Sequence, residues 1–348
     1  MQLMRILPKT TALKLNEFEW RAATLESQAA RSNLVSKGFH WQRLLGDGSS
    51  LYLRHGDCCA TELNDVAAAD VYQALICADQ ASARPIAKAK SMAIVNLTAD
   101  SFSDGGTYQS SEARLLKHCQ RLIDDGASIL DLGAESTRPG AEEVGAQSQI
   151  DLLSNAMRVL SPLNIPLSID TRSAKVADHC LAAGAVMIND VSAFGDADMA
   201  AVVASHDAQV VLMHSRATSK TMQQHCDYDY LIGEICDELA PRINHGLSEG
   251  VNPERIIIDP GIGFAKDARQ SFEIIQCLNA FRSLGFPVLA GPSRKSFLAS
   301  VLPERAAAQR DGATAGAASI CVYHGAEYLR LHCGGMNWDA VKIAQACS

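Results

Sequence analysis

From about residue 91 to its end, the chain alternates between two patterns of apolar residues. Eight short runs rich in β-branched residues are each followed by a longer segment with helical periodicity. The short runs predict strands at 92–97, 128–133, 166–170, 186–190, 209–214, 255–259, 287–291 and 328–332. The longer segments predict helices at 111–125, 143–160, 173–183, 197–205, 230–248, 271–284, 313–323 and 338–346.

This alternation restricts the fold class, because strands joined by helical crossovers run parallel to one another. Eight such units over roughly 250 residues match the size of a closed (β/α)8 barrel. The alternative is an open doubly wound sheet, which has fewer units and a glycine fingerprint after its first strand. Here the first strand leads into "NLTADSFSDGG", which lacks that fingerprint. We therefore predict an α/β fold of the TIM-barrel type over residues 91–348.

Residues 1–90 do not continue the alternation. Helical stretches are predicted at 22–36 and 64–80, and a strand at 50–54. "ADQASARPIAKAKS" then has the small residues and the proline of a connector. We interpret residues 1–90 as a separate N-terminal α+β module, whose role the sequence does not indicate.

Composition narrows the choice of partners and compartment. The net charge is −8 with no basic stripe, which argues against a nucleic-acid partner. No apolar stretch of about 20 residues predicts a membrane span, and the first residues lack the apolar core of a signal peptide. The 11 cysteines are scattered without a Cys-x-x-Cys pair, so we expect reduced thiols in a cytoplasmic protein.

Polar residues end nearly every predicted strand. In a barrel these ends meet on one face, where such folds place their chemistry. Asp170, Asn189, Asp259 and Lys295 would bring acceptors, an amide and a cation to this face. That set suits a flat heterocycle with several ring nitrogens and amino groups. Taken singly, each acidic residue is also explained as a helix or loop cap.

A second group at these ends is basic. It comprises Arg138, Arg294 beside Lys295, and Arg330 with His332. Arginine side chains match phosphate oxygens. Arg330 and His332 are two residues apart on one strand, so they face the same side. Because two cations in a barrel mouth are costly without an anion, the pattern favours a phosphate or pyrophosphate ligand.

Metal binding is indicated only through this anion. Asn96 and nearby carboxylates can hold Mg²⁺, which prefers oxygen ligands and binds alongside substrate phosphates. His214 ends the fifth strand with no second histidine at ligand spacing, so we interpret it as a structural or hydrogen-bonding residue.

Taken together, the strand-end motifs resemble those of dihydropteroate synthase, in the same order and spacing over about residues 91–348. They are "IVNLTADSFSDGG", "DLGAESTRPGA", "SIDT", "IND", "LMH", "DPGIGF", "SRKSF" and "RLH". This family joins 6-hydroxymethyl-7,8-dihydropterin pyrophosphate to para-aminobenzoate, giving 7,8-dihydropteroate and pyrophosphate in folate biosynthesis. The resemblance also implies bound Mg²⁺, a homodimer and a sulfonamide target.

The resemblance implies a role for each matched residue. The pterin pocket would consist of Asp170, Asn189, Asp259 and Lys295. Pyrophosphate would be bound by Asn96, Thr137, Arg138, Arg330 and His332, with Asn96 also a magnesium ligand. Phe264 and Ser296 would contact para-aminobenzoate. The catalytic residues would be Asp104, Arg138, Asp170 and Lys295.

The chain also departs from the family pattern. Ala99 replaces the usual first-loop proline, which loosens the turn. The other departures are Ala134, Ser215–Ala217, Pro292 and Cys333. Two alternatives follow: a pterin-binding paralog with lost or altered catalysis, and a methyltetrahydrofolate methyltransferase, which shares a pterin barrel. The second has no use for the Arg330–His332 pair.

Overall fold

The computed structural model describes most of the chain from residue 88 onward. The described ranges are 88–97, 108–135, 144–216, 224–228, 231–332 and 334–347, with only the backbone given at 108–110 and 283. From the N-terminal part, it describes the backbone of three short strands at 22–25, 39–43 and 50–54.

Eight parallel strands form the centre of the molecule. They are β4 (Lys90–Asn96), β5 (Ile129–Gly133), β6 (Leu167–Asp170), β7 (Met187–Asp190), β8 (Gln209–Met213), β9 (Ile256–Asp259), β10 (Leu289–Ala290) and β11 (Tyr328–Leu331). Their order in the sheet is β10-β11-β4-β5-β6-β7-β8-β9, so neighbours in sequence are neighbours in space. A parallel bridge between Ile258 and Val288 joins the two edges. The predicted (β/α)8 barrel is confirmed, and the open sheet is excluded.

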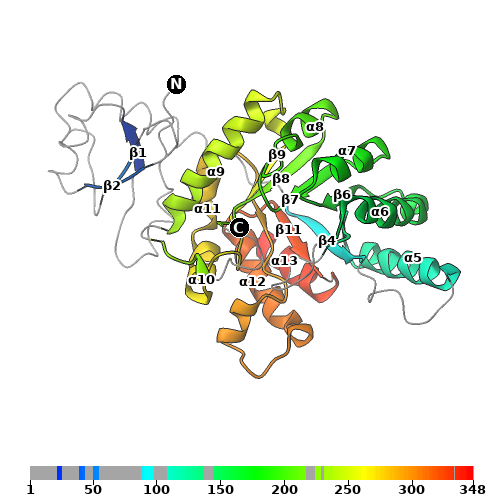
Figure 1. Cartoon of the computed structure of the whole chain (residues 1–348). Helices are drawn as coiled ribbons and strands as arrows, with labels where there is room; N and C mark the ends of the chain where they lie inside the picture. The colour runs from blue at the N-terminus through cyan, green and yellow to red at the C-terminus, as the bar shows by residue number, and fades with distance from the viewer. Residues whose placement is uncertain are drawn as a thin grey trace.

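Helices surround these strands, from α5 through α8 to α9 and on to α13 (Figure 1). They are α5 (Tyr108–Asp124), α6 (Ala146–Leu160), α7 (Ala174–Ala182), α8 (Met199–Ser205), α9 (Leu231–Ser248), α10 (Ala268–Gln276), α11 (Leu278–Phe281), α12 (Asp311–Tyr323) and α13 (Met336–Ala346). Short 3-10 segments include Ser296–Ser300, after β10. Within the described residues we find no helix with the length and apolar run needed to span a bilayer.

One predicted helix, at 271–284, differs from the structure. It begins earlier, at Ala268, because Asp267 accepts the N–H of Gln270 and completes a capping box. It also breaks at Cys277, whose backbone leaves the helical region before α11 begins. Periodicity located this segment, but local backbone chemistry determined its ends.

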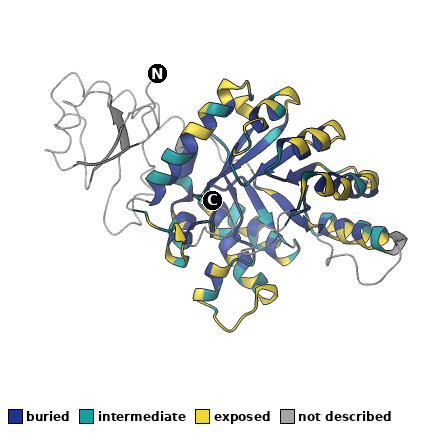
Figure 2. Ribbon diagram, viewed as in Figure 1, coloured by how far each residue is buried: buried dark blue, intermediate teal, exposed yellow. Residues whose placement is uncertain are grey.

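The core has two parts. A large cluster lies between the strands and the inward faces of the helices, and the outer helix faces are exposed (Figure 2). A smaller cluster of side chains from seven strands packs together as a separate group: Met92, Ile129, Met187, Val211, Ile257, Leu289 and Tyr328. These residues precede the polar strand ends along their strands, so the barrel is packed with apolar side chains below its polar mouth.

The three N-terminal strands, β1 (Ala22–Leu25), β2 (Phe39–Arg43) and β3, pair antiparallel in the order β1-β3-β2. The predicted strand at 50–54 is confirmed as β3 (Ser50–Arg54). The predicted helix at 22–36 is wrong at its start, because Ala22–Leu25 forms β1 and pairs with β3. Helix propensity differs among most residues by less than about 1 kcal/mol, so pairing with a neighbouring strand overrides it. The helix predicted at 64–80 lies outside the described residues.

Candidate active site

The strand register places four predicted or neighbouring positions at one level of the barrel. Asn96 is aligned with Gly133, Gly133 with Asp170, and Asp170 with Asn189. These positions end or nearly end their strands, so their side chains reach the mouth formed by the carboxyl ends. The sequence prediction that these residues meet on one face is confirmed for this part of the barrel.

Four side chains from this level and from positions earlier on β5 and β11 form a largely buried network, which we call the mouth cluster: Asp131, Asp170, Asn189 and Arg330. Arg330 donates from Nε to Asp131 Oδ2 and from Nη2 to Asp170 Oδ2, and both donor–acceptor distances are 2.6 Å. Asn189 Nδ2 donates to the same Asp131 oxygen over 3.1 Å. The planar guanidinium thus joins β11 to β5 and β6.

Arg330 corrects an argument made from the sequence. We expected it to need an incoming anion, but two carboxylates of the protein already neutralise it. The sequence analysis missed Asp131, which is completely buried. A signal was available: an aspartate at the centre of the apolar strand "ILDLG" requires a buried partner.

Burial acts on the pKa of Asp170 in this cluster. It raises the pKa of Asp170 to about 7, although the nearby Arg330 guanidinium acts in the opposite direction. The two carboxylates raise the pKa of Arg330, which keeps it charged. Asp131 Oδ1 is buried and has no hydrogen-bond partner among the described residues. An acceptor left in this state is suited to an N–H group of a bound molecule.

Lys295 lies next to this cluster, after β10. Its ammonium donates to the carbonyl of Ile262 and lies 4.5 Å from the centre of the Phe264 ring. Burial lowers the pKa of Lys295 to about 8, while the Asp259 carboxylate opposes that shift. Asp259 Oδ1 accepts the N–H of Gly261 over 2.7 Å, which fixes the turn that leads to Phe264. The structure therefore brings Lys295, Asp259 and Phe264 together, as predicted.

His332 has a fixed orientation. Its backbone N–H donates to Ser293 Oγ over 3.1 Å, and its ring Nδ1 lies 3.0 Å from the same oxygen. The Ser293 hydroxyl thus holds both the backbone and the Nδ1 edge of His332.

Two further basic or polar residues are placed differently. Arg294 makes a bidentate pair with Asp311, at 2.7 and 2.9 Å, so it supports the loop rather than the phosphate group we expected. Ser296 is exposed at the start of a 3-10 helix, next to Lys295.

Asn96 is the magnesium ligand predicted within the described residues. It is exposed at the end of β4, and its Oδ1 lies 3.8 Å from where a Cβ on Gly133 would be. The described residues contain no group of three or more His, Cys, Asp or Glu able to hold a metal. One amide oxygen fits an ion that arrives with substrate phosphates and keeps several waters.

Several predicted residues lie outside the described ranges. They are Asp104 in the first loop, Thr137 and Arg138 in the second, and the departures Ala99 and Cys333. Their roles stay predictions.

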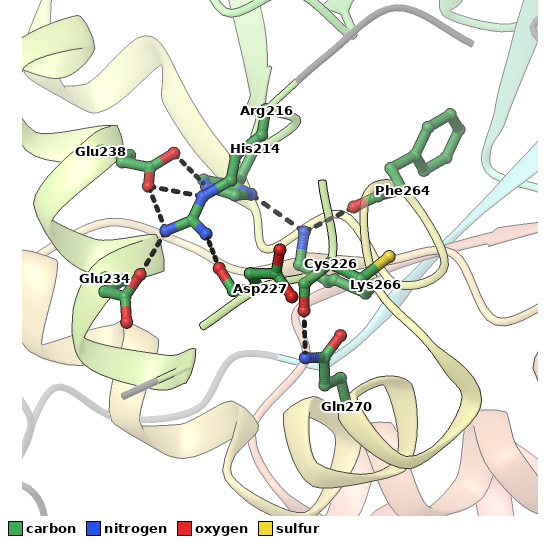
Figure 3. Close-up of polar contacts among 9 residues, drawn as sticks. All are labelled: His214, Arg216, Cys226, Asp227, Glu234, Glu238, Phe264, Lys266 and Gln270. Carbon is green, nitrogen blue, oxygen red and sulfur yellow. Dashed lines mark hydrogen bonds and ion pairs between the residues drawn. The ribbon is translucent and has the colours of Figure 1, made fainter. Parts of the chain in front are cut away.

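A second network, buried at His214 and Lys266, lies beside the mouth, where β8 ends against α9 (Figure 3). His214 Nε2 lies 3.0 Å from Glu238, and its Nδ1 lies 2.9 Å from the ammonium of Lys266. Lys266 also donates to the carbonyl of Phe264 over 2.8 Å. We call Glu238, His214 and Lys266 the His214 brace. The interpretation of His214 as a hydrogen-bonding residue is confirmed, but the sequence analysis missed its partners.

The brace has an unusual charge state. Burial and the adjacent Lys266 lower the pKa of His214 to about 4, so the ring is neutral at pH 7. Hydrogen bonds from His214 and Arg216 outweigh burial and lower the pKa of Glu238 to about 2. Burial lowers the pKa of Lys266 to about 7.

A cavity of about 620 Å³ opens on the outer side of this brace, between the end of β8 and α9. Its described lining includes Ser192, His214, Glu238, Arg242 and His245, and none of the mouth cluster. Its walls mix acidic and basic groups and so indicate no single ligand class.

Comparison with known proteins identifies the family. The model of a family described as "Pterin binding enzyme" matches residues 92–332. A dihydropteroate synthase of Synechocystis sp. is 40% identical over 258 residues, covering 74% of this chain and 87% of the relative. The chain belongs to the dihydropteroate synthase family.

Solved dihydropteroate synthases share the fold. The enzyme of Clostridium difficile, solved in the presence of pteroic acid, is 34% identical with a TM-score of 0.70. The match covers 76% of this chain and 98% of the Clostridium difficile chain. The Xanthomonas albilineans enzyme in complex with 7,8-dihydropteroate is 33% identical, covers 76% of this chain and 95% of its own, and has a TM-score of 0.67.

Three departures from the dihydropteroate synthase motifs are in described parts of the barrel. Ala134 and Pro292 are buried after β5 and β10, so they affect packing at the mouth. Ser215 precedes Arg216, which pairs with Glu234 and Glu238 on α9. The dihydropteroate synthase loop after β8 is therefore tied to α9 in this chain.

Proposed function

We propose that the mouth cluster and its neighbours carry out the dihydropteroate synthase reaction. The reaction condenses 6-hydroxymethyl-7,8-dihydropterin pyrophosphate with para-aminobenzoate and releases pyrophosphate. The observation that carries the assignment of residues is the mouth cluster itself. It gathers Asp131, Asp170, Asn189 and Arg330 from four strands into a buried polar site at the end of the barrel where this fold binds substrates.

Pterin recognition follows from the polar atoms available. A dihydropterin presents ring N–H and amino donors along one edge, and carboxylates are acceptor-only when ionised. Asp131 Oδ1 is a buried acceptor with no partner among the described residues. Asp170 and Asn189 belong to the same cluster, Asp259 lies near Lys295 and Arg330, and the Lys295 ammonium would supply a donor for the ring carbonyl. The dihydropteroate bound in the Xanthomonas albilineans enzyme supports this assignment.

The bond changes are a substitution at the exocyclic methylene of the pterin. The carbon–oxygen bond breaks with its electron pair on pyrophosphate, and the dihydropterin ring delocalises the cation left on the methylene. Buried carboxylates stabilise that cation, with Asp170 proposed as the nearest. The lone pair of the aniline nitrogen then forms the carbon–nitrogen bond, and its proton leaves to solvent. The neutral aniline needs no strong base.

The departing pyrophosphate requires positive charge and hydrogen-bond donors. We assign this task to His332 and Arg330, with Thr137 and Arg138 from the second loop, and we propose that Asp104 in the first loop closes over the site. Arg330 is already paired with two carboxylates, so it would stabilise the pyrophosphate through the fixed orientation of its guanidinium rather than through an unpaired charge. Mg²⁺ bound by Asn96 and the phosphates would neutralise part of the developing charge.

Para-aminobenzoate is proposed to lie against Phe264 and Ser296. The Phe264 ring and the Lys295 ammonium are 4.5 Å apart, so an apolar wall and a cation stand side by side. This combination suits a benzoate, whose ring packs on an aromatic face and whose carboxylate pairs with a cation.

We also propose a homodimer and a cytoplasmic location. Exposed apolar side chains gather on the last two helices, with Ile320 and Tyr323 on α12 and Met336 and Ile343 on α13. These helices pack against each other, so their outer faces offer a candidate interface. No disulfide is formed among the described cysteines, which supports a reducing compartment.

The test supplies the purified chain with dihydropterin pyrophosphate, para-aminobenzoate and Mg²⁺, and follows pyrophosphate release. We expect release that depends on para-aminobenzoate, with dihydropteroate formed in equal amount. Pterin binding without turnover would instead favour the non-catalytic paralog. Omitting para-aminobenzoate is the matched control, because it separates condensation from simple hydrolysis.

A further inference from the structure

The β9–α10 loop contains a buried lysine that the proposed chemistry does not use. Lys266 is 2% exposed, two residues after Phe264. Its ammonium donates to the Phe264 carbonyl over 2.8 Å and lies 2.9 Å from His214 Nδ1. In Figure 3 the Phe264 carbonyl is directed to Lys266, and the Phe264 ring points away from it.

The hydrogen bonds of the brace have a defined direction. Glu238 is a carboxylate that can only accept, so His214 must donate to it from Nε2. His214 Nδ1 then has a lone pair, and the Lys266 ammonium donates to it. The chain of donors therefore runs from Lys266 through His214 to Glu238, and a second branch runs from Lys266 to the Phe264 carbonyl.

The brace is anchored on a helix outside the barrel mouth. Glu238 belongs to α9 and also accepts from Arg216 Nε over 2.8 Å. Arg216 bonds Glu234, one turn earlier on α9, and its guanidinium lies 3.7 Å from the centre of the Tyr228 ring. Rigid helical residues thus hold one end of the chain of contacts.

The other end of the brace reaches the proposed second-substrate site. The same loop gives the Ile262 carbonyl to the Lys295 ammonium, which also lies over the Phe264 ring. Gly261 approaches so closely that a Cβ there would lie 2.0 Å from the His214 carbonyl oxygen. The loop is therefore seated directly on the end of β8, where the brace begins.

We propose that Lys266, held by His214 and Glu238, is a positioning residue that fixes Phe264 and the Ile262 carbonyl for para-aminobenzoate. The proposal rests on the function proposed above and deepens it. A methionine of similar volume would fill this space without the penalty of burying a charge. The lysine amine is needed because its N–H groups reach the Phe264 carbonyl and the His214 ring at once, whereas a thioether has no donor.

The first experiment compares Lys266→Met with the parent chain in the pyrophosphate-release assay. We expect the KM for para-aminobenzoate to rise about tenfold, because one buried hydrogen-bond donor is lost from the wall of that site. The dissociation constant for dihydropterin pyrophosphate, measured by calorimetry, should change less than about twofold, since the mouth cluster is untouched. Equal loss of affinity for both substrates would overturn the proposal.

Asp267→Ala is the matched control. Asp267 is the next residue in the loop, and its side chain caps α10 by accepting the N–H of Gln270. Its removal should lower the melting temperature by a few degrees and leave the ratio of the two substrate affinities unchanged. If Asp267→Ala raised the para-aminobenzoate KM as much as Lys266→Met, the effect would be general loosening of the loop.

A second variant tests the proposal if the Lys266→Met chain fails to fold. His214→Phe leaves Lys266 in place but removes its acceptor, so the para-aminobenzoate KM should shift in the same direction.

Amide hydrogen exchange of the 260–268 segment tests the brace without turnover. Faster exchange there in Lys266→Met supports the brace even if the parent chain releases no pyrophosphate. Unchanged exchange contradicts it.

Discussion

The barrel contains two buried charge networks that differ in how fully their polar atoms are paired. In the mouth cluster, Asp131 shares one oxygen between Arg330 and Asn189, while its other oxygen has no partner among the described residues. In the His214 brace, both ring nitrogens of His214 have partners, and Lys266 ends on a backbone carbonyl.

This difference separates binding from support. A network with an unused buried acceptor gains stability when a donor arrives, so it is suited to a ligand. A network that closes on the backbone gains nothing from a ligand and instead fixes a loop. Lys295 contacts the loop held by the brace and lies near the mouth cluster, so it connects the two.

The largest effect is expected from removing that connection. Lys295→Ala deletes the cation beside Asp259 and Phe264, and kcat/KM should fall about a hundred- to a thousandfold, as for loss of a charged group in a dry site. The measurement is steady-state pyrophosphate release. Lys342→Ala, an exposed lysine on α13 that pairs with Asp339, is the control and should retain full activity. A fully active Lys295→Ala chain would remove Lys295 from the site.

Breaking the mouth cluster should cost stability as well as binding. Asp131→Asn keeps the shape but leaves Arg330 with one carboxylate instead of two, which should lower the free energy of unfolding by about 3 kcal/mol. Urea unfolding measures this change, and pterin binding should weaken in parallel. Asp124→Asn, at an exposed position of α5, should stay within about 0.5 kcal/mol of the parent. If both variants behaved alike, the cluster would contribute no more than a surface charge.

Acid should affect the two networks with opposite sign. The pKa of His214 is lowered to about 4, so the unfolded chain binds more protons than the folded chain between about pH 4 and 6.5, and stability falls as pH falls through this window. The pKa of Asp170 is raised to about 7, so its contribution to stability increases as pH falls from about 7 toward its ordinary value.

Variants separate these two contributions. We compare the unfolding free energy at pH 7.5 minus that at pH 5. This value should be about 2 kcal/mol lower in His214→Gln than in the parent, because the acid-sensitive imidazole is gone. In Asp170→Asn the same difference should grow, since the opposing group is removed. An identical pH dependence in all three chains would show that neither residue titrates as assigned.

The smallest effect on the barrel is expected far from both networks. Ile343→Asp changes a side chain that is 68% exposed on α13, so the free energy of unfolding of a single chain should move by no more than about 0.5 kcal/mol. Light scattering should nevertheless show a monomer, if α12 and α13 form the dimer interface. Leu247→Asp, on the outer part of α9, should leave the dimer intact. A parent chain that is already monomeric would exclude the interface.

The barrel was predictable because its signal is periodic and repeated. Each of the eight strands was located within a few residues, and the polar residues at their ends were expected to meet. Local signals were weaker at single elements. The start of β1 was predicted as helix, because "AATL" carries helix formers whose preference yields to strand pairing.

The sequence by itself determined the class of fold, the face that carries the polar residues and the family to which the chain belongs. Only the tertiary structure decided which of those residues pair. Arg330 is 199 positions from Asp131, and Lys266 is 52 from His214, so no spacing rule connects them. Strand register and burial bring them together, and a buried charge must then take the partner that is present.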